Sequence, residues 1–266
     1  MSPPEAESKL TRLARSSQLL WRGRERPSRG PRPGLTLDRI VDVAIAVADR
    51  DGLEALSMRR VARELGVGTM SLYRYVPGKA ELLDLMLDKV SDPSEQVAQA
   101  RGKDWRGVLE VGARGAYRTY LAHPWLLQVV NFSRPVFGPN ILAGVDYRVA
   151  GLDGTRLTDR ERVMVISVID GYCIGAARSH VQYLNAARET GITDEEYWQA
   201  QLPVLEQAMA SGRFPALAAL AEDAWTAGWE ETFEFGLQRL LDGLEAVIAT
   251  RSRRRPAGRS RRRATA

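Results

Sequence analysis

The chain has 266 residues, 44% of them hydrophobic and 27% charged, so it is long enough for one large or two modest domains with a sizeable core. No apolar run approaches the roughly 18 residues of a membrane-spanning helix, and no secretory leader is recognisable, so a cytoplasmic protein is expected. A single cysteine, Cys173, excludes a framework of intramolecular disulfides and fits a reducing compartment.

The formal net charge of +5 is unevenly distributed along the chain. Residues 1–34 carry eight Lys and Arg against three Asp and Glu, and residues 251–266 carry eight Arg and no acid. The remaining residues, 35–250, therefore carry a net charge of −8. Because the central part of the chain is acidic, overall charge is a poor indication of nucleic-acid binding, and the pattern of residues has to decide.

The first 34 residues combine a short helical pattern, from Glu5 to Trp21, with the run RGRERPSRGPRPG. A segment so rich in Arg, Pro and Gly cannot build a core, and its composition favours a disordered, solvated arm. The alternative is an arm that lies along DNA phosphates or in a minor groove. Deletion of residues 1–34 would separate the two, since only a DNA-binding arm contributes to affinity and its salt dependence.

The next pattern predicts a helix that begins after Thr36 and ends at Asp51–Gly52. Thr36 can cap it, and Asp38 in its first turn complements the helix dipole. Its apolar residues recur three, four and seven positions apart, as on a helix with one buried side. These residues are Leu37, Ile40, Val41, Ala44, Val47 and Ala48.

Two shorter helices joined by a tight turn are predicted between residues 56 and 78. Ser57 can cap the first, and Gly66 follows it where a helix end adopts a left-handed backbone. The second has about two turns and ends at Pro77–Gly78. Its Leu72 and Val76 share the side that packs against the first helix.

The opposite side of this second helix carries hydroxyl, phenol and guanidinium groups. A short helix with a buried rear and such a front suits the major groove of DNA. The outward residues are Met70, Ser71, Tyr73 and Arg74, flanked by Thr69 and Tyr75.

From about Thr36 to Val90 the sequence resembles the DNA-binding domain of the TetR family of bacterial repressors. The residues that carry the resemblance are Ala44, Gly52-Leu53, Ser57-Met58-Arg59, Ala62, Leu65-Gly66-Val67, Ser71-Leu72-Tyr73, Val76 and Lys79. The resemblance implies an all-α protein with a three-helix helix-turn-helix domain and a larger helical effector-binding and dimerisation domain. A fourth helix, from about Lys79 to Val90, would link the two.

Each candidate DNA-binding residue has a role and a simpler alternative. Arg74 is the candidate for bidentate contact with guanine, although a phosphate contact or a solvated side chain needs the same exposure. Met70 could touch a thymine methyl group or be an ordinary surface methionine. The resemblance places hydroxyls on phosphates, with Lys79 and Arg59 beside the backbone, whereas Arg60 and Arg63 are expected to face solvent. The hydroxyl residues are Thr69, Ser71, Tyr73 and Tyr75.

The rest of the chain shows helical patterns and no β-strand alternation. A polar loop is expected over residues 91–103, and Thr158-x-x-Glu161 predicts a capping box at the start of a long helix. Four regions result: a basic arm over 1–34, a DNA-binding domain with its linking helix over 35–90, a helical effector-binding and dimerisation domain over 91–250, and an Arg-rich disordered tail over 251–266. The expected helices of the third region span 105–123, 125–132, 140–150, 158–188, 193–211, 214–225 and 229–250.

Two of these helices are candidates for a dimer interface, because each has a broad apolar side with closely spaced glycines. Packing within one subunit needs the same pattern, and periodicity does not separate the two. The resemblance favours a homodimer in which two C-terminal helices of each subunit form a four-helix bundle. The residues are Val163, Ile166, Ile169, Asp170, Gly171, Cys173, Ile174, Gly175, Ala177, Val181 and Leu184, and then Phe233, Gly236, Leu237, Leu240, Leu241, Gly243, Leu244, Val247 and Ile248.

The resemblance also implies a pocket for a small-molecule effector of unknown identity. Aromatic and polar residues of the central helices could line it, although aromatic residues at helical spacing are more often core. These candidates are Tyr117, Trp125, Phe132, Phe137, Tyr172, Arg178 and Gln182. No spacing of His, Cys, Asp and Glu indicates a metal site, and no cofactor is expected. With only His123 and His180 in the chain, recognition of a magnesium–tetracycline chelate is not expected.

Two other classes of protein compete with this interpretation. An enzyme is disfavoured because the chain lacks GxSxG, GxxxxGKS/T and GxGxxG motifs and any Cys/His nucleophile pattern. An architectural DNA-binding protein without effector control remains the alternative, and the Arg-rich tail could add non-specific affinity or only solubility. The sequence thus predicts a homodimeric regulator and favours a repressor relieved by a small effector over an activator. It names neither the operator nor the effector.

Overall fold

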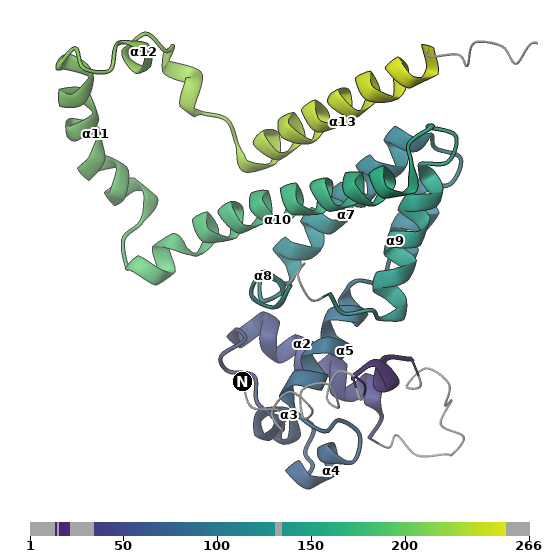
Figure 1. Cartoon of the computed structure of the whole chain (residues 1–266). Coiled ribbons are helices and arrows are strands. Elements are labelled where there is room, and N and C mark those ends of the chain that lie inside the picture. Colours follow the sequence, from purple (N-terminus) through teal and green to yellow (C-terminus); the bar gives the residue numbers. More distant parts are fainter. Residues whose placement is uncertain (1–13, 15, 22–34, 131–134, 254–266) are drawn as a thin grey trace, which may run out of the picture.

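The computed structural model describes residues 14, 16–21, 35–130 and 135–253 (Figure 1). The described part of the chain is helical and holds no β-strand, which confirms the predicted all-α fold. A small unit at one end, which we call the head (residues 35–90), joins a body of longer helices (residues 91–190 and 229–253). A third unit projects from the far end of α10 (Asp159–Thr190) (Figure 1). No described helix is both long and apolar enough to cross a bilayer.

The head contains the four helices that the sequence predicts. Thr36 caps the first through a hydrogen bond that its hydroxyl accepts from the Arg39 amide (3.2 Å), and Ser57 caps the second by accepting one from the Arg60 amide (3.2 Å). The helices are α2 (Leu37–Asp51), α3 (Met58–Glu64), α4 (Thr69–Tyr73) and α5 (Lys79–Val90).

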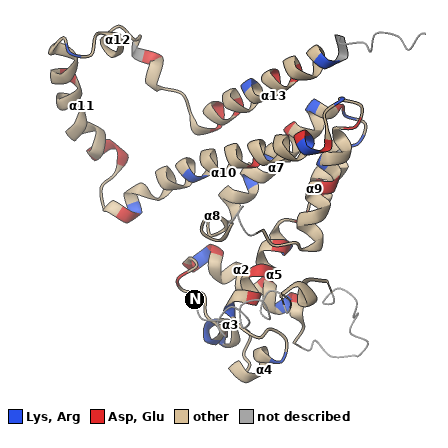
Figure 2. Cartoon of the chain, viewed as in Figure 1, with Lys and Arg blue, Asp and Glu red and all other residues tan. Residues whose placement is uncertain are grey.

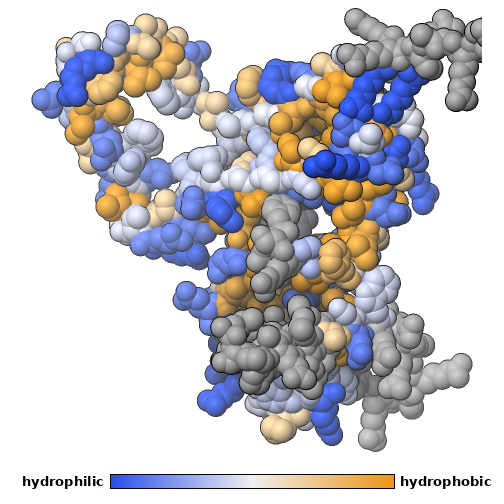
Figure 3. Space-filling model, viewed as in Figure 1, coloured by the Kyte–Doolittle hydropathy of each residue, from blue (hydrophilic) through white to orange (hydrophobic). Residues whose placement is uncertain are grey.

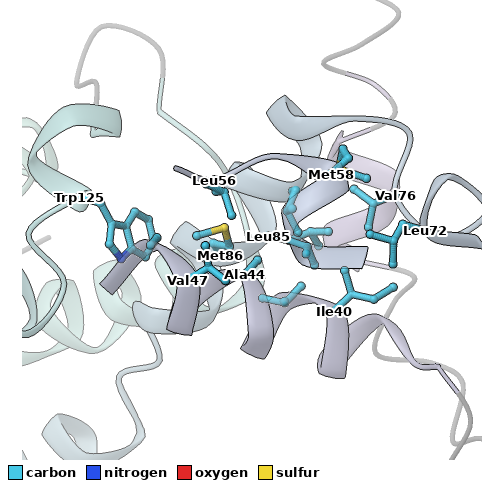
Figure 4. Close-up of a cluster of buried hydrophobic side chains, with 14 of the residues drawn as sticks. Ile40, Ala44, Val47, Leu56, Met58, Leu72, Val76, Leu85, Met86 and Trp125 are labelled. Atoms are coloured by element: carbon cyan, nitrogen blue, oxygen red, sulfur yellow. The ribbon is translucent and has the colours of Figure 1, made fainter. Parts of the chain in front are cut away.

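The head closes around a dense apolar core in which α2, α3, α4 and α5 meet (Figure 4). Its side chains include Ile40, Ala44, Val47, Val61, Leu72, Val76, Leu82 and Met86, none of which is more than 1% exposed. Leu82 and Leu85 of α5 are buried, whereas Leu83, Leu87 and Val90 are only partly covered. The helix packs on two sides, and Leu87 and Val90 turn toward a cavity in the body.

Residues from outside the head complete its core. Trp125 and Leu126, at the end of the body nearest the head, are 2% and 1% exposed and pack in the same cluster. Figure 4 shows the Trp125 ring beside Val47 and Met86. The head is therefore not an independent globule, because the body supplies part of its interior.

A helical segment at residues 14 and 16–21 also packs on the head. Leu20 is 5% exposed within the head core, and the Trp21 indole donates a hydrogen bond to the Phe137 carbonyl (3.1 Å). The interpretation of residues 1–34 as a solvated arm was wrong for this segment. The average composition of residues 1–34 does not reflect Leu19 and Leu20, which fit an apolar recess formed with Leu37 and Leu85. The other residues of 1–34 lie outside the described ones.

The body contains one helix that the sequence missed. Residues 91–103 were predicted as loop, but Ser94–Ala100 forms α6, because the Asp92 carboxylate accepts hydrogen bonds from the Ser94 amide (3.0 Å) and hydroxyl (2.5 Å) at the first turn. The other body helices follow the predicted ranges closely, except that α8 is shorter. They are α7 (Trp105–Ala122), α8 (Leu126–Val129), α9 (Pro139–Gly151), α10 (Asp159–Thr190) and α13 (Trp229–Arg253).

The predicted capping box at the start of α10 is present. The Glu161 carboxylate accepts hydrogen bonds from the Thr158 amide and hydroxyl (both 2.8 Å), and Arg251 of α13 also pairs with it. These contacts, the backbone amide first, lower the pKa of Glu161 to about 2. The box therefore fastens the end of α13 to the start of α10.

A second core holds α7, α10 and α13 together within one subunit. Phe233, Leu237 and Leu241 of α13 are at most 3% exposed and pack with Ile169, Cys173 and Ala177 of α10. These candidate interface residues therefore serve the subunit's own core. The outer faces of the same helices stay exposed, at Val163, Val168, Gly171, Gly175 and Leu184 of α10 and at Phe235, Gly243 and Val247 of α13.

The projecting unit consists of α11 (Asp194–Ala210), α12 (Pro215–Ala218) and the 3-10 helix η1 (Glu222–Trp225), and we call it the arm (Figure 1). Pro203 lies inside α11, and no residue of that helix is buried. Apolar side chains gather on the surface of the arm (Figure 3). Those that are at least 41% exposed are Tyr197, Trp198, Leu202, Val204, Leu205, Phe214, Leu217, Leu220 and Trp225.

Candidate nucleic-acid interface and ligand cavity

The turn between α3 and α4 fixes the direction of α4. Gly66 has a φ of +67°, a left-handed conformation that side chains other than glycine rarely adopt. The Val67 amide donates to the Ala62 carbonyl (3.0 Å) and the Gly66 amide to the Arg63 carbonyl (3.1 Å), which closes the end of α3 as in a Schellman motif. The two helices thus leave the turn at a set angle.

The two sides of α4 differ as the sequence predicts. Leu72 and, just beyond the helix, Val76 are fully buried, whereas Met70 is 76%, Tyr73 43% and Tyr75 37% exposed. Arg74 is also exposed, and Thr69 and Ser71 are partly exposed. The helix has five residues, which is shorter than the predicted two turns. A further turn follows it, in which the Tyr75 and Val76 amides donate to the Leu72 carbonyl (2.8 and 2.9 Å).

Basic residues lie on the helices of the head (Figure 2), and the arginines near α4 form two groups, with and without ion pairs to described residues. Arg50 and Arg60 bind the carboxylates of Asp51 and Glu64 at 2.8–3.0 Å, and the hydrogen bonds from Arg50 are the main cause of the lowered pKa of both acids. Arg60, predicted to face solvent, is therefore neutralised within the head.

The second group of arginines is exposed. Arg59, Arg63 and Arg74 form no ion pair with any residue that the structure describes, so their charge is available to an outside anion. The Lys79 ammonium donates to the Leu53 carbonyl (3.2 Å), which anchors the start of α5 to the segment between α2 and α3.

A cavity of about 230 Å³ lies where α5, α6, α7, α9 and α10 meet. Its walls are mainly aliphatic, and polar groups gather on α6, α7, α9 and α10. In the described ranges, no group of three or more His, Cys, Asp and Glu is placed to hold a metal ion. The cavity is lined by Leu87, Val90, Ser91, Asp92, Pro93, Gln96, Gly112, Ala116, Thr119, Tyr120, Leu126, Val129, Val130, Pro135, Val136, Ile141, Gly144, Val145, Tyr147, Arg148 and Asp170.

A buried ion pair forms part of the polar lining. Arg148 of α9 donates to Asp170 of α10 (2.5 Å) and to the Gly144 carbonyl (2.8 Å), and its side chain is only 12% exposed. Burial also raises the phenol pKa of Tyr120 and Tyr147 above the usual value, so both rings are neutral in neutral solution.

The residues predicted to line an effector pocket lie elsewhere. Tyr117 stacks on Phe233 with ring centroids 4.0 Å apart and shares a hydrogen bond with His180 (2.8 Å), so it belongs to the second core. Tyr172 donates to the Phe233 carbonyl (2.8 Å) and Arg178 to the Leu127 carbonyl (3.1 Å). Trp125 is in the head core, Phe137 is 61% exposed, Gln182 is exposed, and Phe132 lies outside the described residues.

One sequence signal could have located the cavity. Gly112 and Gly115 are three residues apart on α7, and a Cβ at either position would lie within 3.0 Å of a cavity-lining side chain: Tyr147 at Gly112 and Gln96 at Gly115. Two glycines at this spacing in a helix mark a face that other side chains approach closely. The two glycines therefore mark one wall of the cavity, which the predicted aromatic residues do not line.

Two carboxylates of the head bind the body beside this cavity. Asp88 of α5 accepts hydrogen bonds from the Asn140 (2.9 Å) and Ile141 (3.1 Å) amides and so caps α9. Asp49 of α2 accepts hydrogen bonds from the Trp125 indole (2.7 Å) and from the His123 ring (2.8 Å). These hydrogen bonds tie the start of α9 and the segment before α8 directly to helices of the head.

An exposed short helix in a head that also carries exposed cations, fixed to a helical body with a half-open cavity, defines a helix-turn-helix DNA-binding protein with a ligand-binding body. Residues 40–86 match the family described as bacterial regulatory proteins, tetR family, and residues 98–248 match the tetracyclin repressor-like C-terminal domain. The chain belongs to the TetR family of transcriptional regulators.

Relatives in sequence and structure agree with this assignment. The chain is 54% identical over 239 residues to the HTH-type transcriptional repressor DrrR1 of Streptomyces coeruleorubidus, covering 90% of this chain and 88% of that one. It is also similar to crystal structures of ActR, a TetR family protein of Streptomyces coelicolor, in complex with (S)-DNPA and with actinorhodin. Both have a TM-score of 0.64 and 29% identity, and they cover 80% and 81% of this chain and 98% and 99% of ActR.

Proposed function

We propose that the protein is a repressor that binds an inverted-repeat operator as a homodimer and leaves it when a small organic molecule enters the cavity. The observation that carries this proposal is that α5 belongs to both the cavity and the head. It lines the cavity with Leu87 and Val90, binds α9 through Asp88, and shares the head core with α4. A DNA-binding protein without effector control, the alternative, gives no role to this cavity.

On the DNA side, the exposed face of α4 enters the major groove. Arg74 reads a base edge, Met70 contacts a thymine methyl group, and Arg59 and Lys79 bind phosphates beside it. The exposure of Met70 and Arg74 and the absence of an ion pair on Arg74 among the described residues support these roles. The remaining contacts are hydroxyl groups on phosphates, from Thr69, Ser71, Tyr73 and Tyr75.

The outer faces of α10 and α13 form the dimer interface in this proposal. Exposed Val163 and Val168 flank Gly171 and Gly175, whose missing side chains leave room for a partner helix. A two-fold axis between the subunits sets the two α4 helices at one helical turn of DNA, ~34–36 Å, or a multiple of it. The apolar arm offers additional surface for the second subunit.

The relatives support control by a small molecule. DrrR1 is named a repressor, and ActR has been crystallised with two organic compounds. The lining residues that we propose for the effector site are those of the cavity, in place of the aromatic set predicted from the sequence.

A mobility-shift assay with DNA upstream of the adjacent gene tests the function. Arg74→Ala should relax the preference at one base pair of each half-site by ~1–3 kcal/mol, whereas Lys79→Ala should weaken all sequences alike. Equal and uniform losses in both variants would contradict the division into base-reading and phosphate-binding residues. A shift that no compound reverses would favour the architectural alternative.

A further inference from the structure

A helix that lies outside both family matches contacts the head and the body together. The matches cover residues 40–86 and 98–248, whereas this helix lies at residues 16–21 (darkest purple in Figure 1). On the head side, Leu20 is 5% exposed within the head core. On the body side, the Trp21 indole donates a hydrogen bond to the Phe137 carbonyl (3.1 Å), just before the start of α9.

The body segment that Trp21 binds is a wall of the cavity. Pro135 and Val136, which immediately precede Phe137, both line the cavity. Val136 also packs against the head core. The hydrogen bond from Trp21 therefore holds the segment at which the cavity and the head meet.

The same helix borders the hydrogen bonds between α5 and α9. Leu20 lines a recess together with Asp88 and Asn140. Asp88 and Asn140 are both buried, and the Asp88 carboxylate accepts from the Asn140 and Ile141 amides at the start of α9. Such hydrogen bonds are stronger when they are kept from water, so the helix and the Asp88 carboxylate support one junction.

Few contacts hold this helix in place. Of residues 16–21, Ser16 and Leu20 are buried, whereas Trp21 is 50% exposed. A segment with so few buried side chains opens locally at a much smaller cost than global unfolding. Its release can therefore loosen the junction between head and body while the helices of the head stay folded.

We propose that the helix at residues 16–21 is a clamp that sets the orientation of the head relative to the body, with Trp21 as the positioning residue that fixes it to the cavity wall. Orientation matters because a dimer reads two half-sites at a fixed spacing, so its two α4 helices have to be held at that distance. This inference rests on the proposed function as an operator-binding dimer and adds how the head is held.

Hydrogen exchange in the full-length protein, without DNA or ligand, tests the contact itself. Trp21→Phe keeps an aromatic ring and removes the indole donor. Peptides that cover residues 136–142 should exchange ~2–10-fold faster in this variant, as expected for the loss of one hydrogen bond, whereas peptides from the middle of α10 should not change. Gln18→Ala, at an exposed position of the same helix, is the matched control and should leave both sets of peptides unchanged.

Binding to altered operators tests the positioning role. The operator found in the mobility-shift assay is compared with versions whose half-sites lie one or two base pairs further apart. The parent protein should prefer the original spacing, and Trp21→Phe should reduce this preference ~2–10-fold, because a head that turns more freely adapts to other spacings. Affinity for a duplex with a single half-site should stay the same, since the core beneath α4 is intact.

Three results would overturn the inference. They are unchanged exchange at residues 136–142 in Trp21→Phe, an unchanged spacing preference, and an equal loss of affinity for the single half-site, which would show that the helix only supports the fold of the head. Failure of the proposed function looks different, because neither the parent protein nor the variant would then bind an operator. That result would also remove the positioning role, while exchange would still report whether Trp21 holds the cavity wall.

Discussion

The head and the arm are both helical and both carry regularly spaced apolar residues, but these residues are buried in the head and exposed in the arm. In the head, Leu72 of α4 and Val76 just beyond it are fully buried in the core. In the arm, Trp198 of α11 and Trp225 of η1 are 51% and 75% exposed.

The difference shows which unit is complete in a single chain. A soluble monomer rarely exposes a large continuous apolar surface, and such surfaces commonly mark contacts with other molecules. The head buries its apolar residues with help from the body of the same chain, whereas no described residue covers the exposed apolar side chains of the arm. The exposed outer faces of α10 and α13 make a second copy of this chain the partner that we propose for it.

The largest loss of stability is expected when a buried side chain of α4 is shortened. Leu72→Ala should lower the free energy of unfolding by about 2–5 kcal/mol, because it leaves a cavity in a closed core. Urea denaturation measures the loss. Met70→Ala, on the exposed side of the same helix, should stay within ~0.5 kcal/mol of the parent protein, and equal losses would show that the two sides of α4 do not differ as described.

Substitutions in the arm should weaken dimerisation without lowering the stability of the subunit. The double variant Tyr197→Ser/Trp198→Ser should weaken the dimer by ~2 kcal/mol or more, since large aromatic residues carry much of the energy of an interface. Sedimentation at several concentrations measures the dissociation constant. A dimer as tight as that of the parent protein would remove the arm from the interface.

The junction between head and body should show a smaller loss. Asp88→Ala removes the acceptor for two amides at the start of α9, and we expect ~1–3 kcal/mol of lost stability. Gly138→Ala should have a similar effect by a different route, because its Cβ would fall 2.1 Å from the Asp88 carboxylate. Asp88→Asn, which keeps an acceptor, should lie between the parent protein and Asp88→Ala in thermal unfolding.

The last prediction is that the native protein does not react with a thiol reagent. Cys173 is fully buried in the second core, and burial raises the pKa of its thiol to about 12. A thiol reagent at pH 8 should therefore leave the native protein unlabelled and label it only after denaturation. The same result in the arm variant would confirm that the arm can change without opening the body, whereas rapid labelling of that variant would contradict it.

Capping residues and the spacing of apolar residues predicted the features of this fold that depend only on neighbouring residues. Thr36, Ser57 and Thr158 begin the helices that their hydroxyls cap, and the spacing of Leu72 and Val76 identified the buried side of α4. Each of these features depends on residues within one or two helical turns. The expected contacts with DNA remain predictions, since they depend on a partner.

The features that the sequence missed depend on distant segments. α6 has few apolar residues and was taken for loop, yet Asp92 caps it and Gln96 lines the cavity. The lining of that cavity comes from several helices, so no single periodic pattern contains it. Aromatic residues were the natural candidates, but Tyr117 and Trp125 are large enough to fill the two cores instead.

The short helix at residues 16–21 has a practical bearing on how the protein is prepared. The match to the DNA-binding family begins at residue 40, so a shortened version cut close to that boundary would lack Leu20 and Trp21. Such a version would uncover Leu37, Val41 and Leu85 to water and would lose the hydrogen bond to the Phe137 carbonyl. Recombinant versions intended for crystallisation or operator titration should therefore start upstream of Ser16.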